Sequence, residues 1–502
     1  MNINSIVRRL CPVETERLMG FPDNYLLIDG ENTPDSPRYK GCGNSQSTNC
    51  TEWLSIRMEH ALRETGFAQN DRTIQYATVC SGVEAQSLGC RNLNWHANFF
   101  SEIEPFPCKV LATHYPDVPN MGDLSKMSVK DYSVDVFCGG FPCTDVSVAG
   151  KRLGSMEGSG TRSSLAHHAS RICDECLKDG GLFLYENVVG LYSCNEGRDF
   201  TWYIHRMTEA GFAVAWRTLD TQWVWTASHP RAIPQRRRRM WMLCYKGSDW
   251  RIPVRVLFER TSRLGTVHPN RIVDGRIIRS EEDEAAAAFD LFGGNEPTFS
   301  HDSRADMIPF SEMPGKGDDF LTLSDLSLVD FFRKVGTIQY VGGIFDGASE
   351  VANISARLRE NIGNAGCAVG GRIVTLKIPE WSAGIQLPFG AECPAEYDGT
   401  VCGLSDVLLP MTDDLLGYIL SPRACTGILR RADKRGKKLP EPLELALHEQ
   451  IANWACGAFG DAVKADAKDE AEEAEGGDEE VETDEDGNPI GDAALCTENG
   501  EV

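Results

Sequence analysis

Short apolar runs alternate with helical patterns between residues 73 and 245. The runs predict buried strands at 75–80, 96–101, 134–138, 181–185, 213–219 and 240–245. Helices are predicted after the first and second strands, at about 162–177 and at about 199–211. Strands separated by helices indicate βαβ units, and therefore a doubly wound, mainly parallel α/β sheet. The loops at the carboxyl ends of such strands lie along one edge, where ligands bind.

The chain on either side of this block follows other patterns. Residues 1–65 hold two helical patterns separated by a loop rich in Pro, Asp and Gly, and residues 250–455 are less regular and carry many Gly and Pro. No apolar run reaches the roughly 18 residues of a membrane span. The N-terminal stretch MNINSIVRRL lacks the apolar core of a signal peptide. We therefore expect no membrane association and a cytoplasmic location.

The chain holds 18 cysteines, scattered along its length. Without an export signal, reduced thiols are the expected state. Cys173 and Cys176 form a C-x-x-C pair with no second pair to match it. We interpret this pair as a feature of a helix surface rather than a zinc site, and we predict no metal.

Reactive side chains follow, or lead into, three of the predicted strands. Cys143 lies in GGFPCTDVSVAGKR, directly after the third strand, and Glu186 opens the ENV segment directly after the fourth. The segment IPQRRRRMWML leads into the sixth strand, and a period of two places Arg237 and Arg239 on one face. A thiol needs a lowered pKa or a neighbouring base to attack at neutral pH. Each residue alone is explained by packing or exposure, but together at neighbouring strand ends they predict one reactive pocket.

These segments, in this order, resemble the motif set of the DNA cytosine-C5 methyltransferase family. The matching patterns are GFPC-x₃-S-x-AG, ENV and Q-x-R-x-R, accompanied by CSGVEA (80–85), SEIEPF (101–106), GDL (122–124) and GTRSSL (160–165). The resemblance implies a Rossmann-like fold that binds S-adenosyl-L-methionine as the methyl donor. It implies cofactor contacts at Cys80, Ser81, Gly82, Val83, Glu84, Glu102, Ile103, Asp123, Leu124 and Pro142. Glu102 would hold the ribose hydroxyls, and Asp123 would accept a hydrogen bond from the adenine amino group.

Two further motifs stand in an order that departs from the family. Segments 8–25 (RRLCPVETERLMGFPDNY) and 39–49 (YKGCGNSQSTN) resemble the motifs that normally close the chain, but here they open it. The order is that of a circular permutation, which is tolerated where termini lie close together. It implies that Asn44 and Ser45 close over the cofactor. The segment 421–447 resembles phage-encoded relatives, which indicates a viral or prophage source.

The resemblance also implies a mechanism. The Cys143 thiolate adds to C6 of a cytosine while Glu186 bonds the N3 edge, C5 then takes the methyl group, and β-elimination frees the enzyme. We expect Arg237 to contact the base carbonyl oxygen with Arg239 helping, and Asn187 to support the Glu186 loop. The target atoms are stacked inside a duplex, so the cytosine must be flipped out.

These assignments divide the chain into four parts. They are a permuted N-terminal segment (1–65), a catalytic and cofactor-binding domain (66–249), a target-recognition domain (250–455) and an acidic tail (456–502). The segment 144–160 is a fitting lid for the catalytic domain.

Charge is distributed unevenly along the chain. Of the net charge of −24, residues 461–502 carry −15 (17 acidic residues and two lysines), which leaves −9 for residues 1–460. Such a tail is typical of a disordered solvating extension, with competition against DNA as an alternative. Basic residues gather at 236–239 and at 430–438. The second cluster is either a set of phosphate contacts or a solvated helix end.

The expected partner is double-stranded DNA, bound by a monomer. Two alternatives stay open: the protein acts with a cognate restriction endonuclease in a restriction-modification system, or it acts without one. Rival hypotheses are a tRNA cytosine methyltransferase, an inactive DNA-binding protein that keeps the fold, an adenine amino-methyltransferase and a thiol redox enzyme. The last two are disfavoured because the chain has no D/N-P-P-Y/F segment and because its C-x-x-C pair follows no fitting strand.

Overall fold

The computed structural model divides the chain into two compact units, residues 1–15 with 407–502 and residues 16–406. The structure describes residues 6–28, 33–69, 71–140, 165–192, 198–224, 226–257, 272–273, 276–277, 337–341, 365–369, 372–377, 402–436 and 438–456.

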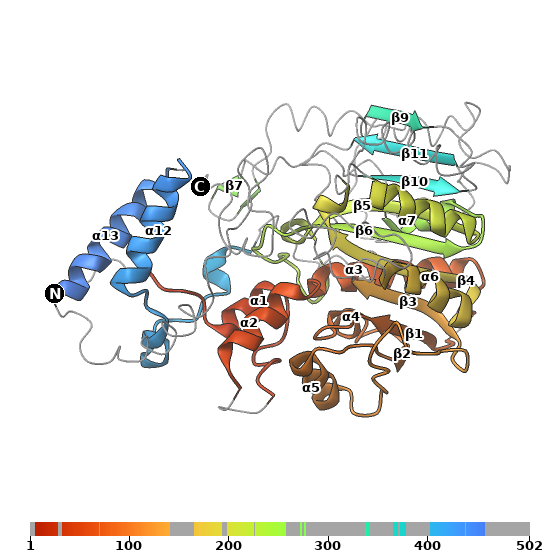
Figure 1. The fold of residues 1–502 in the computed structure, drawn as a ribbon, viewed down its shortest axis with the longest axis horizontal. Helices are drawn as coiled ribbons and strands as arrows, with labels where there is room; N and C mark the ends of the chain where they lie inside the picture. Colours follow the sequence, from red (N-terminus) through yellow and green to blue (C-terminus); the bar gives the residue numbers. More distant parts are fainter. Residues whose placement is uncertain are drawn as a thin grey trace. The chain divides into compact units, whose positions relative to one another are not determined.

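The larger unit is built on a nine-stranded sheet in the order β2-β1-β3-β4-β6-β5-β10-β11-β9 (Figure 1). The strands are β1 (Ile74–Val79), β2 (Trp95–Phe99), β3 (Val134–Gly140), β4 (Leu177–Val188), β5 (Phe212–Asp220), β6 (Arg238–Lys246), β9 (Thr337–Val341), β10 (Ala365–Val369) and β11 (Arg372–Lys377). Strands β1 to β4 are parallel neighbours. Strand β6 is antiparallel to both β4 and β5, so β5 runs in the same direction as β1 to β4. The doubly wound α/β fold is thereby confirmed.

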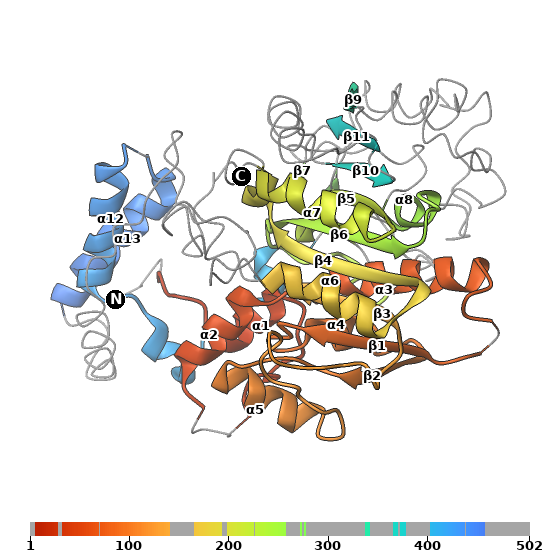
Figure 2. The same cartoon turned by 45° about the vertical axis from the view of Figure 1, so that its right-hand side comes forward.

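Helices cover both faces of this sheet (Figure 2). Along the larger unit and its N-terminal approach they are α1 (Pro12–Leu18), α2 (Asp35–Asn44), α3 (Thr48–Glu64), α4 (Ala85–Gly89), α5 (Pro105–His114), α6 (Leu165–Cys176), α7 (Arg198–Glu209) and α8 (Arg251–Leu257). On one face Trp53 and Leu54 of α3 pack with Leu184 of β4. On the other, Ile172 of α6 and Ile204 of α7 pack in one cluster with the alternate residues of β4. Alternate side chains of β4 therefore point to opposite faces of the sheet and pack into two separate cores.

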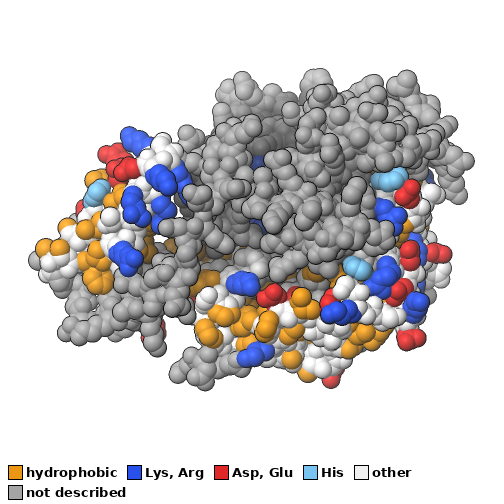
Figure 3. All heavy atoms as spheres, viewed as in Figure 1, with side chains coloured by type: hydrophobic (Ala, Val, Ile, Leu, Met, Phe, Trp, Pro, Cys, Tyr) orange, Lys and Arg blue, Asp and Glu red, His pale blue; other side chains and the backbone are white. Residues whose placement is uncertain are grey.

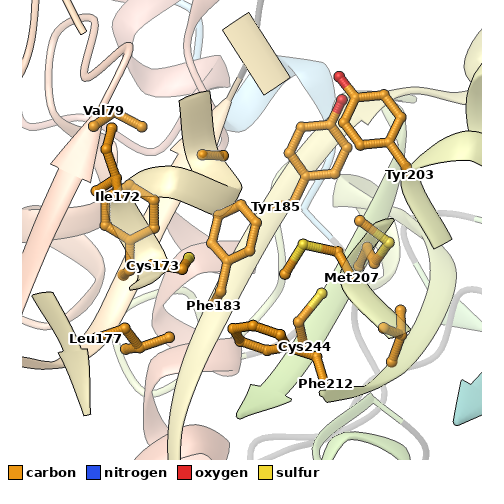
Figure 4. Close-up of a cluster of buried hydrophobic side chains, with 14 of the residues drawn as sticks. Val79, Ile172, Cys173, Leu177, Phe183, Tyr185, Tyr203, Met207, Phe212 and Cys244 are labelled. Atoms are coloured by element: carbon orange, nitrogen blue, oxygen red, sulfur yellow. The ribbon is translucent and has the colours of Figure 1, made fainter. Parts of the chain in front are cut away.

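The C-x-x-C pair is part of the second core, shown in Figure 4. Cys173 and Cys176 are 0% and 4% exposed. Their expected place on a helix surface is therefore wrong, because both lie on the side of α6 that packs into this core with Ile172, whereas Asp174 between them is exposed. Burial raises the pKa of Cys176 to about 12. In the part of the chain that the structure describes, no group of three or more metal-ligating side chains occurs.

Several element boundaries differ from the predicted ones. Strand β4 begins at Leu177 rather than 181, since pairing with Val134 of β3 extends it through the polar residues 178–180. The N-terminal segment forms three helices rather than two. Its second pattern is interrupted at Ser45, whose extended backbone (ψ 161°) ends α2. Within the irregular region, β10 pairs with β5 and so extends the sheet.

The smaller unit joins the start of the chain to a helical hairpin, α12 (Pro422–Lys434) and α13 (Glu441–Ala455). The buried amide of Gln450 makes the junction. Its Oε1 accepts from the Val7 amide at 2.6 Å, and its Nε2 donates to the carbonyl oxygens of Val7 (2.6 Å) and Leu420 (2.8 Å). One buried amide side chain thus bonds three backbone groups from two distant segments. Over the described residues, no helix has the length and apolar character needed to cross a membrane.

Candidate cofactor and catalytic site

The turn after β1 has left-handed backbone at three positions. The φ angles are 48° at Cys80, 54° at Gly82 and 65° at Glu84. Only Gly82 lacks the Cβ that makes this region costly. The Gly82 amide donates to Oε2 of Glu102 at 2.7 Å, and the Ser81 amide donates to the Ser101 carbonyl at 3.2 Å. The turn therefore ties the carboxyl ends of β1 and β2 together.

Glu102 is held in place by backbone donors. Besides Gly82, the amides of Ile103 and Glu104 donate to its Oε1 at 2.7 and 2.8 Å. The adjacent Ile103 side chain is 67% exposed, an unusual position for a large apolar group. A fixed carboxylate beside an exposed apolar side chain is a suitable setting for a ligand with hydroxyl groups and an aromatic ring.

Asp123 lies in the next loop along this edge. Its Oδ1 accepts from the Ser125 hydroxyl at 2.7 Å, and Lys126 lies 3.0 Å from Oδ2. Hydrogen bonds from these two side chains lower the pKa of Asp123 to about 2. The following residue, Leu124, is buried. The expected acidic group is therefore ionised at neutral pH.

Asn120 joins the loops of Glu102 and Asp123. Its Oδ1 accepts from the amides of Glu102 (2.9 Å) and Gly122 (3.1 Å), and its Nδ2 donates to the Glu102 carbonyl at 3.1 Å. Sequence reasoning missed this residue. An Asn two positions before a turn glycine is a signal that could have found it, because Asn side chains commonly bond backbone groups in turns.

Glu84 is a buried carboxyl beneath the turn, with 1% exposure. Its Oε2 accepts from the Thr78 hydroxyl at 2.7 Å, and its Oε1 accepts from the Ser87 hydroxyl (2.9 Å) and amide (3.1 Å). Through these hydrogen bonds Glu84 joins the end of β1 to the start of α4, and the preceding residue, Val83, is buried as well. Burial raises the pKa of Glu84 to about 7, against the hydrogen bonds from Thr78 and Ser87, which lower it.

This raised pKa predicts a pH-dependent stability. The folded pKa of about 7 lies above the usual glutamate pKa of 4.5, so the carboxyl favours folding most below pH 4.5 and this contribution is lost as the pH rises through 7. Glu84→Gln should remove up to about 3 kcal/mol of the decrease in unfolding free energy between pH 5 and pH 8. Urea unfolding across this range measures it, with the exposed Asp117→Asn as control. An unchanged pH profile in Glu84→Gln would contradict the assignment.

Two of the predicted catalytic side chains, Glu186 and Arg239, meet at the ends of β4 and β6. Gly140 of β3 pairs in register with Glu186 of β4. Oε1 of Glu186 lies 3.2 Å from Nε of Arg239, which begins its antiparallel pairing opposite Val188. Both side chains are largely buried, 12% and 19% exposed. The structure therefore brings Glu186 and Arg239 into one ion pair at the strand ends.

Gln46 also reaches this place, from the connection between α2 and α3. A Cβ atom on Gly140 would lie 3.4 Å from Oε2 of Glu186 and 3.5 Å from Nε2 of Gln46, so both polar ends lie beside Gly140. Sequence reasoning selected the two preceding residues, Asn44 and Ser45, and missed Gln46. Only the long-range approach of this segment to β3 singles it out.

Cys143 and Pro142 lie outside the described residues. Strand β3 carries the chain as far as Gly140, three positions before the cysteine. The role of Cys143 as nucleophile therefore remains a prediction from the sequence. The strand that precedes it, β3, ends at Gly140, which pairs with Glu186.

Asn187 faces away from Glu186 and is 4% exposed. Its Nδ2 donates to the Tyr185 hydroxyl at 2.5 Å, and its Oδ1 accepts from the Val188 amide at 2.8 Å. These hydrogen bonds stabilise the end of β4 on the side opposite Glu186, which is compatible with the supporting role expected from the sequence.

Arg237 binds the N-terminal segment. Its Nη2 donates to the carbonyl oxygens of Gly43 at 3.0 Å and Ser45 at 2.6 Å, while its backbone amide donates to Oδ1 of Asp220 at 3.0 Å. Ser45 is buried, whereas Asn44 is exposed. The structure thus gives the two arginines different positions, with Arg237 on the N-terminal segment and Arg239 on the carboxylate.

Arg237→Ala should loosen the N-terminal segment. The change removes two hydrogen bonds from a charged donor and leaves the buried Ser45 carbonyl without it, which predicts a loss of about 2–4 kcal/mol in stability. Hydrogen exchange of the amides at 43–47 and urea unfolding measure the effect. The exposed neighbour Arg236→Ala is the control, and equal exchange in the two variants would show that Arg237 does not hold this segment.

The start of α3 is fixed to the connection after β5. The Ser47 and Thr221 hydroxyls lie 2.5 Å apart, and Nδ2 of Asn49 donates to the carbonyls of Thr221 (2.9 Å) and Val224 (2.8 Å). The N-terminal segment is therefore anchored on both sides of Gln46.

Comparison with known proteins agrees with this arrangement. Residues 74–286 match the family described as C-5 cytosine-specific DNA methylase. The chain is 32% identical over 165 residues to the type II methyltransferase M.NlaIV of Neisseria lactamica, which covers 31% of this chain and 35% of that protein. These matches support the C-5 cytosine-specific DNA methylase family. They likewise support a DNA methyltransferase.

The chain is also similar to a relative with a different named activity and to a solved structure. The chain is 29% identical over 245 residues to a DNA N-6-adenine-methyltransferase of Escherichia phage P1, covering 39% of this chain and 31% of that protein. A putative DNA modification methyltransferase encoded in an E. coli prophage aligns with a TM-score of 0.27 and 19% identity, over 34% of this chain and 47% of that one. The chain spans about a third of the length of the curated relatives named here.

Proposed function

We propose that this protein is a DNA (cytosine-5-)-methyltransferase that modifies a flipped-out cytosine through a covalent bond to Cys143. The observation that carries the proposal is the Glu186–Arg239 ion pair beside Gly140, at the strand end that leads to Cys143. The match of residues 74–286 to C-5 cytosine methylases supports it independently.

The residues of the β1 and β2 turns fit S-adenosyl-L-methionine. A glycine with left-handed backbone at 82, a fixed carboxylate at Glu102 and an exposed apolar group at Ile103 suit the methionine, ribose and adenine parts in turn. Asp123 and the buried Leu124 would lie on the adenine side, and Asn44 and Ser45 would close the opposite side. When bound, this cofactor supplies the methyl group that C5 of the cytosine receives.

The protein groups handle the base and its protons. The Cys143 thiolate would form a bond to C6, and Glu186 would bond the N3 edge as the ring accepts electron density. Arg237 would contact the carbonyl oxygen of the same base, and Arg239, which pairs with Glu186, would help. Loss of the C5 proton would expel the thiolate and release the product.

The N-terminal segment would complete this site, as in a circularly permuted chain. Three contacts support the proposal. Helix α3 packs into the core against the sheet, Arg237 donates to the carbonyl oxygens of Gly43 and Ser45, and Gln46 lies with Glu186 beside Gly140. The domain boundaries, the target-recognition role of residues 250–455 and the phage origin stay predictions.

Methyl transfer from labelled S-adenosyl-L-methionine to unmethylated duplex DNA tests the proposed function. After digestion to nucleosides, we expect the label in 5-methyldeoxycytidine. Label in N6-methyldeoxyadenosine would favour the activity named for the phage P1 relative, and label in RNA alone would move the substrate to RNA. Absence of label from both nucleic acids would leave a DNA-binding protein without this activity.

A further inference from the structure

Helix α12 has two distinct faces. Its buried side holds Cys425, which is 0% exposed and lies against the Gln450 amide of α13 at 3.8 Å. Its N-terminus is capped by Ser421, whose hydroxyl accepts from the Ala424 amide at 3.2 Å. The hairpin is therefore a defined helical element whose outer side is presented to solvent.

Cationic side chains occupy the outer side. We call the following exposed residues the basic face of α12: Arg430, Arg431, Lys434, Arg435 and Lys438. Arg430 and Lys434, and likewise Arg431 and Arg435, are four positions apart, which places each pair on one side of the helix, and Lys438 follows the end of the helix. Figure 3 shows Lys and Arg side chains gathered over α12. Across the described ranges, no ion pair involves any of the five.

A stabilising role in the helix does not account for this face. Cations in the last turn interact favourably with the helix dipole, and Arg431 and Lys434 occupy that turn. One or two charges suffice for that effect, because it fades beyond the last turn. Five neighbouring cations without carboxylate partners repel one another, which indicates an external anion as their partner.

We propose that the basic face of α12 binds the phosphate backbone of DNA and anchors the substrate through the smaller unit. The inference rests on the proposed function, which makes DNA the substrate. Residues 1–460 carry a net charge of −9, and a concentrated cationic face on such a chain is where phosphates are attracted. Arginine also matches phosphate oxygens in a two-pronged geometry.

The test compares two triple variants of the full chain with equal charge loss. One is Arg430→Gln, Lys434→Gln and Lys438→Gln on the basic face. The matched control is Arg91→Gln, Lys109→Gln and Lys130→Gln, exposed positions of the larger unit. Binding to a labelled 30-base-pair duplex is measured by fluorescence anisotropy from about 50 to 200 mM KCl.

Log affinity falls with log salt, and the triple variant of the basic face should make this slope less steep by about 2–3. Each lost phosphate contact removes about 0.9 from the magnitude of the slope. Affinity near 100 mM salt should fall tenfold or more, and the KM for DNA should rise while kcat at saturating DNA is retained. The control should change the slope by less than one. Equal slope changes in both variants would overturn the proposal.

The acidic tail is the competing occupant of this face. If the tail rather than DNA pairs with it, the effect of the triple variant should vanish in a chain that ends at residue 460, and the proposal is then wrong. If DNA is the occupant, the effect persists in the shorter chain. The binding readout needs no methyl transfer, so failure of the proposed function and failure of this inference give different results.

Discussion

Cys143→Ala should abolish methyl transfer, with a loss of about 10⁴-fold or more. The variant lacks the atom that bonds C6, and removal of a covalent nucleophile leaves only binding and electrostatic contributions. Labelled methyl transfer to duplex DNA under single-turnover conditions measures the loss. The exposed Cys456→Ala is a matched control that should keep full activity.

A trapped adduct would identify the bond itself. Duplex DNA that carries 5-fluorocytosine cannot lose a proton from C5, so elimination of the thiolate is blocked and the complex should survive denaturation. We expect the slow-migrating complex with the wild type and with Cys456→Ala, and none with Cys143→Ala. Retained methylation in Cys143→Ala would exclude this cysteine as the nucleophile.

Glu186→Gln should reduce kcat by about 10²–10⁴-fold, the range of a positioned acid or base. Glutamine keeps the shape of the side chain, and its amide oxygen can face Arg239, whose Nε lies 3.2 Å from the carboxylate, so the fold should be retained. It cannot exchange a proton with the N3 edge. Single-turnover rates and urea unfolding separate the two effects.

The exposed carboxyl Glu209→Gln on α7 is the control for this change. A kcat within about threefold of the wild type in Glu186→Gln would remove the carboxyl from the reaction. A large loss of stability in place of a rate effect would instead show that the Glu186–Arg239 pair serves the fold.

Local pattern determined a large part of this protein. The strands β1 to β6 lie within a few residues of their predicted positions, because strands buried on both faces of a sheet appear in the sequence as short apolar runs. The same pattern placed Glu186 at a strand end, and its neighbour Asn187 behind it. Even so, β4 starts early, since a partner strand can order polar residues that carry no apolar signal.

Tertiary structure alone decided which residues meet. The pairing of Glu186 with Arg239 rather than Arg237, the approach of Gln46 and the bonds of Gln450 to Val7 join segments far apart in the chain. Such contacts leave no periodic trace, because they depend on how the elements pack rather than on neighbouring residues. The sequence by itself therefore determined the elements and the candidate chemistry, whereas long-range packing decided the partners of each side chain.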